Sequence, residues 1–195
     1  MKTVFFDVDT QIDFLFPAGA LYVPGAERLL PAFAQLNRYA AVHGIPLVST
    51  TDAHAENDPE FRTWPPHCVA GTAGQAKPAT TLLDIRTRTV IPDRPVRVET
   101  AAPQIVLEKR VLDPFSNPNM PTLLAALGAD EYVVYGVVTE YCVRAAALGL
   151  AATGRPVTLV TDAIQALDQA ACDRTFQEFA GRGGRLASLS QVCAR

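Results

Sequence analysis

The stretch Val137-Val138-Thr139-Glu140-Tyr141-Cys142-Val143-Arg144 joins an apolar run to a series of strong helix formers. The apolar run, 132–135, predicts a buried strand, and 145–152 predicts a helix. Cys142 is therefore expected where the strand passes into the helix, in its first turn. Backbone N–H groups are unpaired there and the helix dipole favours an anion, so the thiol is expected to tend toward the thiolate. Taken alone, a free cysteine is more often a small, buried and inert residue.

Length and composition restrict the class of protein. A chain of 195 residues with 49% hydrophobic residues is expected to form a single domain, 1–195, with a substantial core. The net charge is −3, which argues against a nucleic-acid or anionic-membrane partner. No apolar run is long enough to span a bilayer, and the charged residues Lys2 and Asp7 are not typical of a secretory signal. A cytoplasmic location follows, with the four cysteines expected as free thiols.

Strand-like and helix-like segments alternate along the chain. The expected strands are 3–8, 45–50, 106–108, 132–135, 157–160 and 185–188. The expected helices are 26–42, 121–127, 140–152 and 168–180. This alternation predicts an α/β fold of three layers, with a mainly parallel, doubly wound sheet and helices on both faces.

An irregular, proline-rich insertion interrupts this alternation after the second strand, at about 52–104. Its segments 88–91 and 96–99 alternate like strands and suggest a small β-ribbon. A loop of this length inside a domain is usually functional.

Residues suited to chemistry follow the expected strands, where open α/β sheets bind their ligands. They are Asp7, Asp9, Asp52, His54, Lys109, Cys142 and Asp162. Cys142, Lys109 and Asp9 together suit acyl transfer through a thioester, with Asp9 moving the proton and Lys109 favouring the thiolate. The backbone N–H groups of Val138 and Cys142 would face the oxyanion. Considered alone, Asp9 could instead be a carboxylate that caps a turn, and Lys109 could be a solvated lysine.

A second group of candidate residues lies in the insertion. Asp52, His54, Glu60 and His67 fall within sixteen positions and include two of the three histidines. Two imidazoles and two carboxylates are sufficient for a zinc, manganese or iron site. Loop residues that only form hydrogen bonds are the alternative.

Four segments resemble the isochorismatase-like cysteine hydrolases, and most closely their nicotinamidases. They are 8–14, Asp52-Ala53-His54 with 64–72, Glu108-Lys109, and 136–143. In order and spacing they cover most of the chain. The sequence Trp-Pro-Pro-His-Cys-Val at 64–69 is the part that points to nicotinamidases, whereas the cysteine turn is shared more widely.

The resemblance implies hydrolysis of nicotinamide to nicotinate and ammonia by a triad of Asp9, Lys109 and Cys142. It further implies a cis peptide at Val137–Val138, Val137 beside the substrate, and a ring held between Phe14 and Trp64. A divalent metal, zinc first with manganese or iron as alternatives, would be bound by Asp52, His54, Glu60 and His67 and would hold the pyridine nitrogen. The resemblance also implies a homo-oligomer acting on a small-molecule amide.

Several positions depart from the nicotinamidase pattern. Glu60 stands where many nicotinamidases have a third histidine, Ile12 replaces an asparagine and Arg110 a glycine, and 113–117 differs near the expected pocket. Two alternatives therefore stay open: a relative that hydrolyses another amide or a ureido or carbamoyl acid, and a non-catalytic binding module. A dinucleotide-dependent oxidoreductase is disfavoured, because no G-x-G-x-x-G follows the first strand.

Overall fold

The computed structural model describes residues 1–84 and 88–194. Across these residues one parallel sheet of seven strands runs in the order β3-β4-β2-β1-β5-β6-β7. The strands are β1 (Thr3–Val8), β2 (Leu47–Asp52), β3 (Thr89–Ile91), β4 (Gln104–Lys109), β5 (Glu131–Val137), β6 (Val157–Gln165) and β7 (Arg185–Ala187). The predicted parallel α/β sheet is confirmed.

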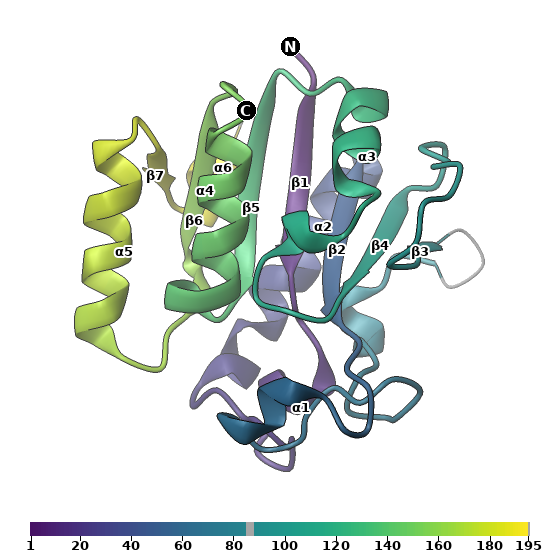
Figure 1. The fold of residues 1–195 in the computed structure, drawn as a ribbon. Coiled ribbons are helices and arrows are strands. Elements are labelled where there is room, and N and C mark those ends of the chain that lie inside the picture. Colours follow the sequence, from purple (N-terminus) through teal and green to yellow (C-terminus); the bar gives the residue numbers. More distant parts are fainter. Residues whose placement is uncertain (85–87, 195) are drawn as a thin grey trace.

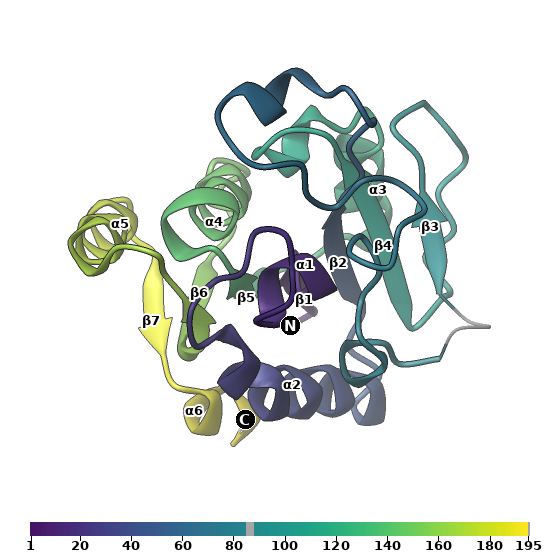
Figure 2. The same cartoon turned by 90° about the horizontal axis from the view of Figure 1, so that it is seen from below.

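Helices cover both faces of this sheet. Figure 2 shows α3, α4 and α5 on one face and α2 and α6 on the other, while α1 lies at the carboxyl ends of the strands (Figure 1). The helices are α1 (Ile12–Leu15), α2 (Leu30–Val42), α3 (Met120–Leu127), α4 (Arg144–Ala151), α5 (Gln169–Gly181) and α6 (Leu189–Cys193). A 3-10 turn, Ala26–Leu29, precedes α2. No helix in the described part of the chain is long and apolar enough to cross a membrane.

The middle of the sheet is buried on both faces. Every residue of β2 and β5 is buried, as are all but the first of β1. Strands covered by helices on both sides read as nearly continuous apolar runs. This is why the strands at 3–8 and 132–135 could be recognised from sequence.

The insertion folds differently from the expectation. β3 forms, but it pairs in parallel with β4 at the edge of the main sheet, and 96–99 contains no strand. The predicted β-ribbon is therefore wrong. Asn119 explains the difference in part, because its side chain accepts a hydrogen bond from Val96 N–H at 2.9 Å and donates to the Pro92 and Arg94 carbonyls. These bonds hold 92–96 against α3 instead of against a second strand. Residues 85–87 of the insertion lie outside the described residues.

Asp162 was expected just after a strand, but β6 continues to Gln165. Its carboxylate accepts a hydrogen bond from the backbone N–H of Leu189 at 2.7 Å, and the residue is exposed. Asp162 therefore joins β6 to α6 and is not part of the expected group of site residues.

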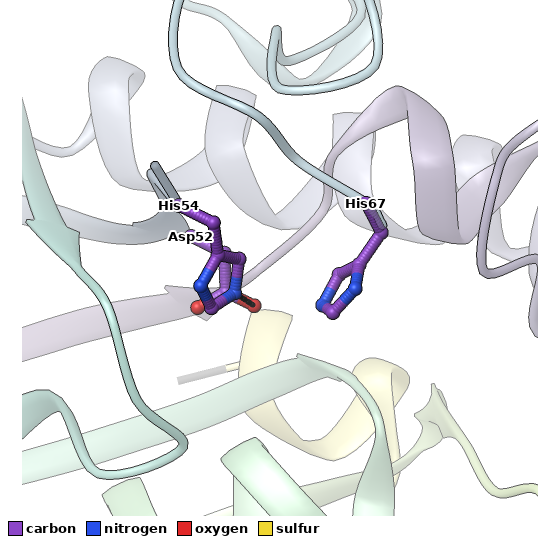
Figure 3. A group of neighbouring side chains, drawn as sticks. All are labelled: Asp52, His54 and His67. Carbon is purple, nitrogen blue, oxygen red and sulfur yellow. Dashed lines mark ion pairs between the residues drawn. The ribbon is translucent and has the colours of Figure 1, made fainter. Parts of the chain in front are cut away.

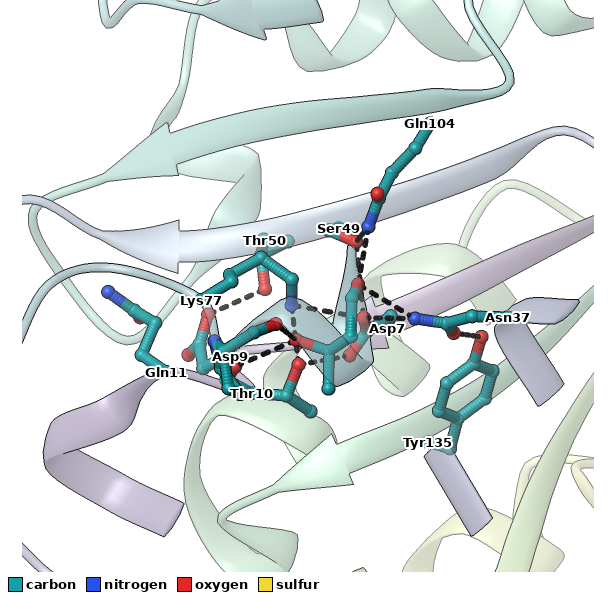
Figure 4. Close-up of polar contacts among 12 residues, drawn as sticks. Asp7, Asp9, Thr10, Gln11, Asn37, Ser49, Thr50, Lys77, Gln104 and Tyr135 are labelled. Carbon is teal, nitrogen blue, oxygen red and sulfur yellow. Dashed lines mark hydrogen bonds and ion pairs between the residues drawn. The ribbon is translucent and has the colours of Figure 1, made fainter. Parts of the chain in front are cut away.

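A buried ion pair attaches the insertion to the central strand. Lys77 Nζ lies 3.0 Å from Asp7 Oδ2, and their side chains are 2% and 0% exposed. Lys77 also donates to the Thr10 hydroxyl, while Asn37 and Ser49 donate to the same Asp7 oxygen at 3.1 and 3.2 Å. Figure 4 shows these side chains converging on Asp7 from several elements. The network fixes the backbone just before Asp9.

Replacing Lys77 with methionine is expected to destabilise the fold by about 3–5 kcal/mol, because the Asp7 carboxylate would be buried without its counter-charge. The combined Asp7→Asn and Lys77→Met variant is expected to recover a large part of that loss. Urea unfolding of the two variants and the parent measures both effects. A loss below about 1 kcal/mol in Lys77→Met would contradict the assigned role of the pair.

Candidate active site

The sheet order brings four strand ends together. The chain builds β2, β4 and β3 on one side of β1 and then crosses to build β5, β6 and β7 on the other. The carboxyl edge beside β1 is therefore a topological switch point, where α/β sheets bind ligands. Gly136 allows β5 to approach β1 closely, since a Cβ there would lie 2.0 Å from the Val8 carbonyl oxygen. Asp9, Asp52, Lys109 and Cys142 meet at this edge.

Lys109 lies between the other three groups. Its Nζ is 2.8 Å from Asp9 Oδ2, 2.5 Å from Asp52 Oδ1 and 3.5 Å from Cys142 Sγ. The residue is 1% exposed, so the solvated-lysine alternative is wrong. Although burial disfavours the ammonium, the Asp52 and Asp9 carboxylates more than offset it and hold the pKa of Lys109 well above its ordinary value.

Asp9 is held by its backbone and by β2. It adopts a left-handed conformation with φ of 50°, which is uncommon for a residue other than glycine. Its Oδ1 accepts a hydrogen bond from the Thr50 hydroxyl at 2.6 Å, leaving Oδ2 for Lys109. Carboxylate oxygens of Asp9 and Asp52 and the Cys142 sulfur all lie within 4.8 Å of one another. The Asp9 carboxylate therefore lies within reach of the Cys142 thiol. The alternative, in which Asp9 only caps a turn, does not predict this proximity.

Cys142 lies in a widened, π-helical turn, Thr139–Val143, between β5 and α4. Such turns occur frequently at functional sites. The preceding peptide bond between Val137 and Val138 is cis, as the resemblance implies. Burial raises the pKa of the Cys142 thiol well above its ordinary value; Lys109 opposes this rise, and Asp9 and Asp52 add to it. This direction is opposite to the expected tendency toward the thiolate.

Three of the predicted metal ligands lie together. Figure 3 shows Asp52, His54 and His67 pointing toward one another, and one ligand atom of each lies within 4.8 Å of the others. Glu60 belongs to a second group, with His54 and Asp58, that shares His54 with the first. Burial raises the pKa of Asp52 to about 6 and lowers that of His67.

The imidazoles of these residues suit a divalent cation. His67 Nδ1 lies 2.8 Å from the Pro65 carbonyl oxygen and can only donate to it, which leaves the Nε2 lone pair free. His54 is fully buried, and neither of its ring nitrogens has a hydrogen-bond partner among the described residues. A buried imidazole nitrogen without a partner is costly, and a cation between His54, His67 and Asp52 would satisfy it.

An apolar pocket opens beside Cys142 and the metal candidates. It encloses about 420 Å³ of empty space, including its open mouth. Phe14, Trp64 and Val137 line it, as predicted, together with Cys142, Asp52, Glu60 and His67. Its other lining residues are Leu21, Val23, Leu112, Val138, Tyr141 and Leu167. Largely aromatic and aliphatic walls with a few polar groups are typical of small-molecule sites.

The segment 113–117 was expected near this pocket, but Phe115 is not among the lining residues. Its ring packs on Gly149 of α4, where an added Cβ would lie 2.3 Å from it. Leu112 lines the pocket instead. Phe115 therefore supports the helix behind Cys142, while Leu112 is the residue of this loop that faces a ligand.

Comparison with known proteins identifies the family of this chain. The family model described as the isochorismatase domain matches residues 92–191, just over half of the chain. The chain belongs to the isochorismatase family. The matched segment contains Lys109 and Cys142, whereas Asp9 and the candidate metal ligands precede it.

Similarity to individual proteins extends over nearly the whole chain. The nicotinamidase/pyrazinamidase of Mycobacterium tuberculosis is 26% identical, with 96% of each protein covered. The pyrazinamidase of Pyrococcus horikoshii, solved in complex with zinc, superposes with a TM-score of 0.81 at 27% identity, covering 96% of this chain and 99% of that one. PnC1 from L. infantum in complex with nicotinate has a TM-score of 0.78 at 28% identity, covering 97% and 93%.

Two residues that contact the candidate metal ligands were not predicted from the sequence of this family member. Asp58 Oδ2 lies 3.1 Å from His54 Nδ1, and the Phe61 ring contacts both His54 and His67 at centroid distances of 5.4 and 5.8 Å. The sequence does contain a signal for Asp58. It is a carboxylate four residues after His54, and it directly precedes Pro59, a position from which an Asp side chain can cap a helical turn. Phe61 gave no signal beyond its hydrophobicity.

Proposed function

We propose that the chain hydrolyses nicotinamide to nicotinate and ammonia through a thioester on Cys142. The observation that carries this proposal is the position of Lys109, whose ammonium contacts Asp9 and Cys142. Cys142 in turn lines the pocket that Phe14 and Trp64 border. The family and the nicotinamidase relatives support hydrolysis of an amide C–N bond. The metal candidates on the pocket wall favour a pyridine ring over a linear amide.

In the first half of the reaction, Asp9 takes the proton of the Cys142 thiol as the sulfur attacks the amide carbon. The carbonyl oxygen gains negative charge, which the backbone N–H groups of Val138 and Cys142 stabilise. The C–N bond then breaks, and Asp9 returns the proton to the departing nitrogen, which leaves as ammonia.

In the second half, Asp9 takes a proton from water as the water oxygen attacks the thioester carbon. The C–S bond breaks, the sulfur regains the proton and nicotinate is released. Lys109 stays protonated throughout, because two buried carboxylates surround it. Its charge offsets the negative charge that develops on the sulfur.

Asp52, His54 and His67 would hold a divalent cation, with Glu60 as a further ligand. Zinc fits two imidazoles and carboxylates well, with manganese or iron as alternatives. When bound, the cation would accept the pyridine nitrogen and so fix the ring. Phe14 and Trp64 would cover the ring, and Val137 would border the amide.

Removal of the metal is expected to lower kcat/KM for nicotinamide about tenfold or more, because the ring loses a binding contact. A contact worth about 1.4 kcal/mol changes affinity by a factor of about ten. Ammonia release is measured before chelation, after chelation, and after zinc or manganese is restored. Turnover that survives chelation and prefers a linear ureido acid would favour the alternative function, hydrolysis of a ureido or carbamoyl acid by the same fold. No turnover of any amide, with Cys142 inert to iodoacetamide near neutral pH, would indicate a binding module.

A further inference from the structure

Asp58 contacts two of the candidate metal ligands with its two carboxylate oxygens. Oδ2 lies 3.1 Å from His54 Nδ1, and Oδ1 accepts a hydrogen bond from the backbone N–H of Glu60 at 2.9 Å. The His54 side chain is fully buried, and that of Asp58 is 11% exposed. One carboxylate thus holds an imidazole and the start of the 3-10 turn Pro59–Arg62, which carries Glu60.

The contact determines which nitrogen of His54 can bind a cation. A carboxylate beside Nδ1 stabilises the tautomer with its proton on Nδ1, so the lone pair lies on Nε2. Nε2 is the atom directed toward Asp52, whose Oδ2 is 3.9 Å away. Neither ring nitrogen forms a hydrogen bond of standard geometry within the described ranges, and the contact between Nδ1 and Asp58 is a charge contact at 3.1 Å. The two nitrogens lie on opposite sides of the ring, so the position of Asp58 at Nδ1 suits an orienting role.

His67 provides an internal comparison. Its Nδ1 is hydrogen-bonded to the neutral carbonyl oxygen of Pro65, whereas that of His54 lies 3.1 Å from a carboxylate oxygen of Asp58. A charged partner raises the basicity of an imidazole ligand more than a neutral one does. His54 is therefore expected to be the stronger of the two imidazole ligands.

We propose that Asp58 is a positioning residue for the metal site, fixing the tautomer of His54 and the location of Glu60. The inference rests on the metal site of the proposed function. It extends that site to a residue whose role is exerted through His54 and Glu60 and not through a ligand bond of its own.

The test measures the affinity of the metal-free full-length chain for Zn²⁺ by competition with a chromophoric chelator. Asp58→Ser retains a hydroxyl that can cap the Glu60 N–H but is too short to reach His54. Asp58→Asn retains the length and loses the charge. We expect zinc affinity to fall in the order parent, Asp58→Asn, Asp58→Ser, with the serine variant about 10- to 100-fold weaker than the parent.

Two further variants make the result specific. Glu56→Gln removes an exposed carboxylate of the same loop and is expected to leave zinc affinity unchanged. His54→Ala removes a proposed ligand and defines loss of the site. Unfolding of the metal-free proteins is expected to agree within about 1 kcal/mol for the parent and Asp58→Ser, since the cap is kept. The Co²⁺ absorption spectrum reports whether the geometry of the ligands changes.

Parental zinc affinity in Asp58→Ser, together with a clear loss in His54→Ala, would overturn the positioning role while leaving the metal site in place. Equal losses in Asp58→Ser and Glu56→Gln would also overturn it, because the effect would then be general loop charge. Zinc binding that is the same in the parent and in His54→Ala would refute the metal site itself, and the role of Asp58 with it.

Discussion

Replacing Cys142 with alanine is expected to lower nicotinamide turnover by roughly 10⁴-fold or more, because loss of a nucleophile removes the covalent route as a whole. The residue is 4% exposed and packs within the core, so the smaller side chain leaves a cavity of about one sulfur atom and a modest loss of stability. Ammonia release under saturating substrate measures the effect, with circular dichroism to confirm the fold.

Cys172→Ala is the matched control for this experiment. Cys172 is a second buried free cysteine, but it lies on α5 and does not line the pocket. Its replacement is expected to leave turnover within about twofold of the parent, a difference of about 0.4 kcal/mol in barrier. Turnover that survives Cys142→Ala would refute the nucleophile, and equal losses in both variants would point to packing instead of chemistry.

Asp9→Asn is expected to lower kcat by about 10²- to 10⁴-fold, the usual contribution of a positioned general acid–base group. Asparagine keeps the size of the side chain and can still accept the Thr50 hydroxyl, but it can neither take the thiol proton nor return it. The affinity for nicotinamide is expected to change little, since Asp9 does not line the pocket wall.

Asp130→Asn serves as the control for Asp9. Asp130 is an exposed carboxylate immediately before β5, at the opposite edge of the sheet from Cys142, and it accepts a hydrogen bond from Lys2 N–H. Its replacement removes the same charge without touching the site. Parental kcat in Asp9→Asn would exclude Asp9 as the base.

Much of the site was predictable because parallel strands end at one edge. Buried strands at 3–8, 106–108 and 132–135 predict Asp9, Lys109 and Cys142 at one edge of the sheet, and the structure brings them into contact. The pocket residues Phe14, Trp64 and Val137 followed from the resemblance and line the same cavity.

The sequence did not show which charged side chains contact one another in the site. Lys109 contacts Asp52 as well as Asp9, so one carboxylate links the triad to the metal candidates. Burial of Cys142, with the charges of Asp9 and Asp52, raises the pKa of the thiol, which is opposite to the expected tendency toward the thiolate. Strand pairing in the insertion was also missed, because side-chain bonds from Asn119 outweigh the alternating pattern at 96–99.

We propose that the acyl group of nicotinamide passes through a thioester on Cys142. Turnover in the presence of increasing hydroxylamine tests for this intermediate, because hydroxylamine competes with water for an acyl-enzyme. We predict that nicotinohydroxamate accumulates at the expense of nicotinate in the parent, with neither product formed by Cys142→Ala. Undiminished nicotinate with no hydroxamate, at hydroxylamine concentrations that leave the fold intact, would contradict the thioester and indicate direct attack of water on the amide.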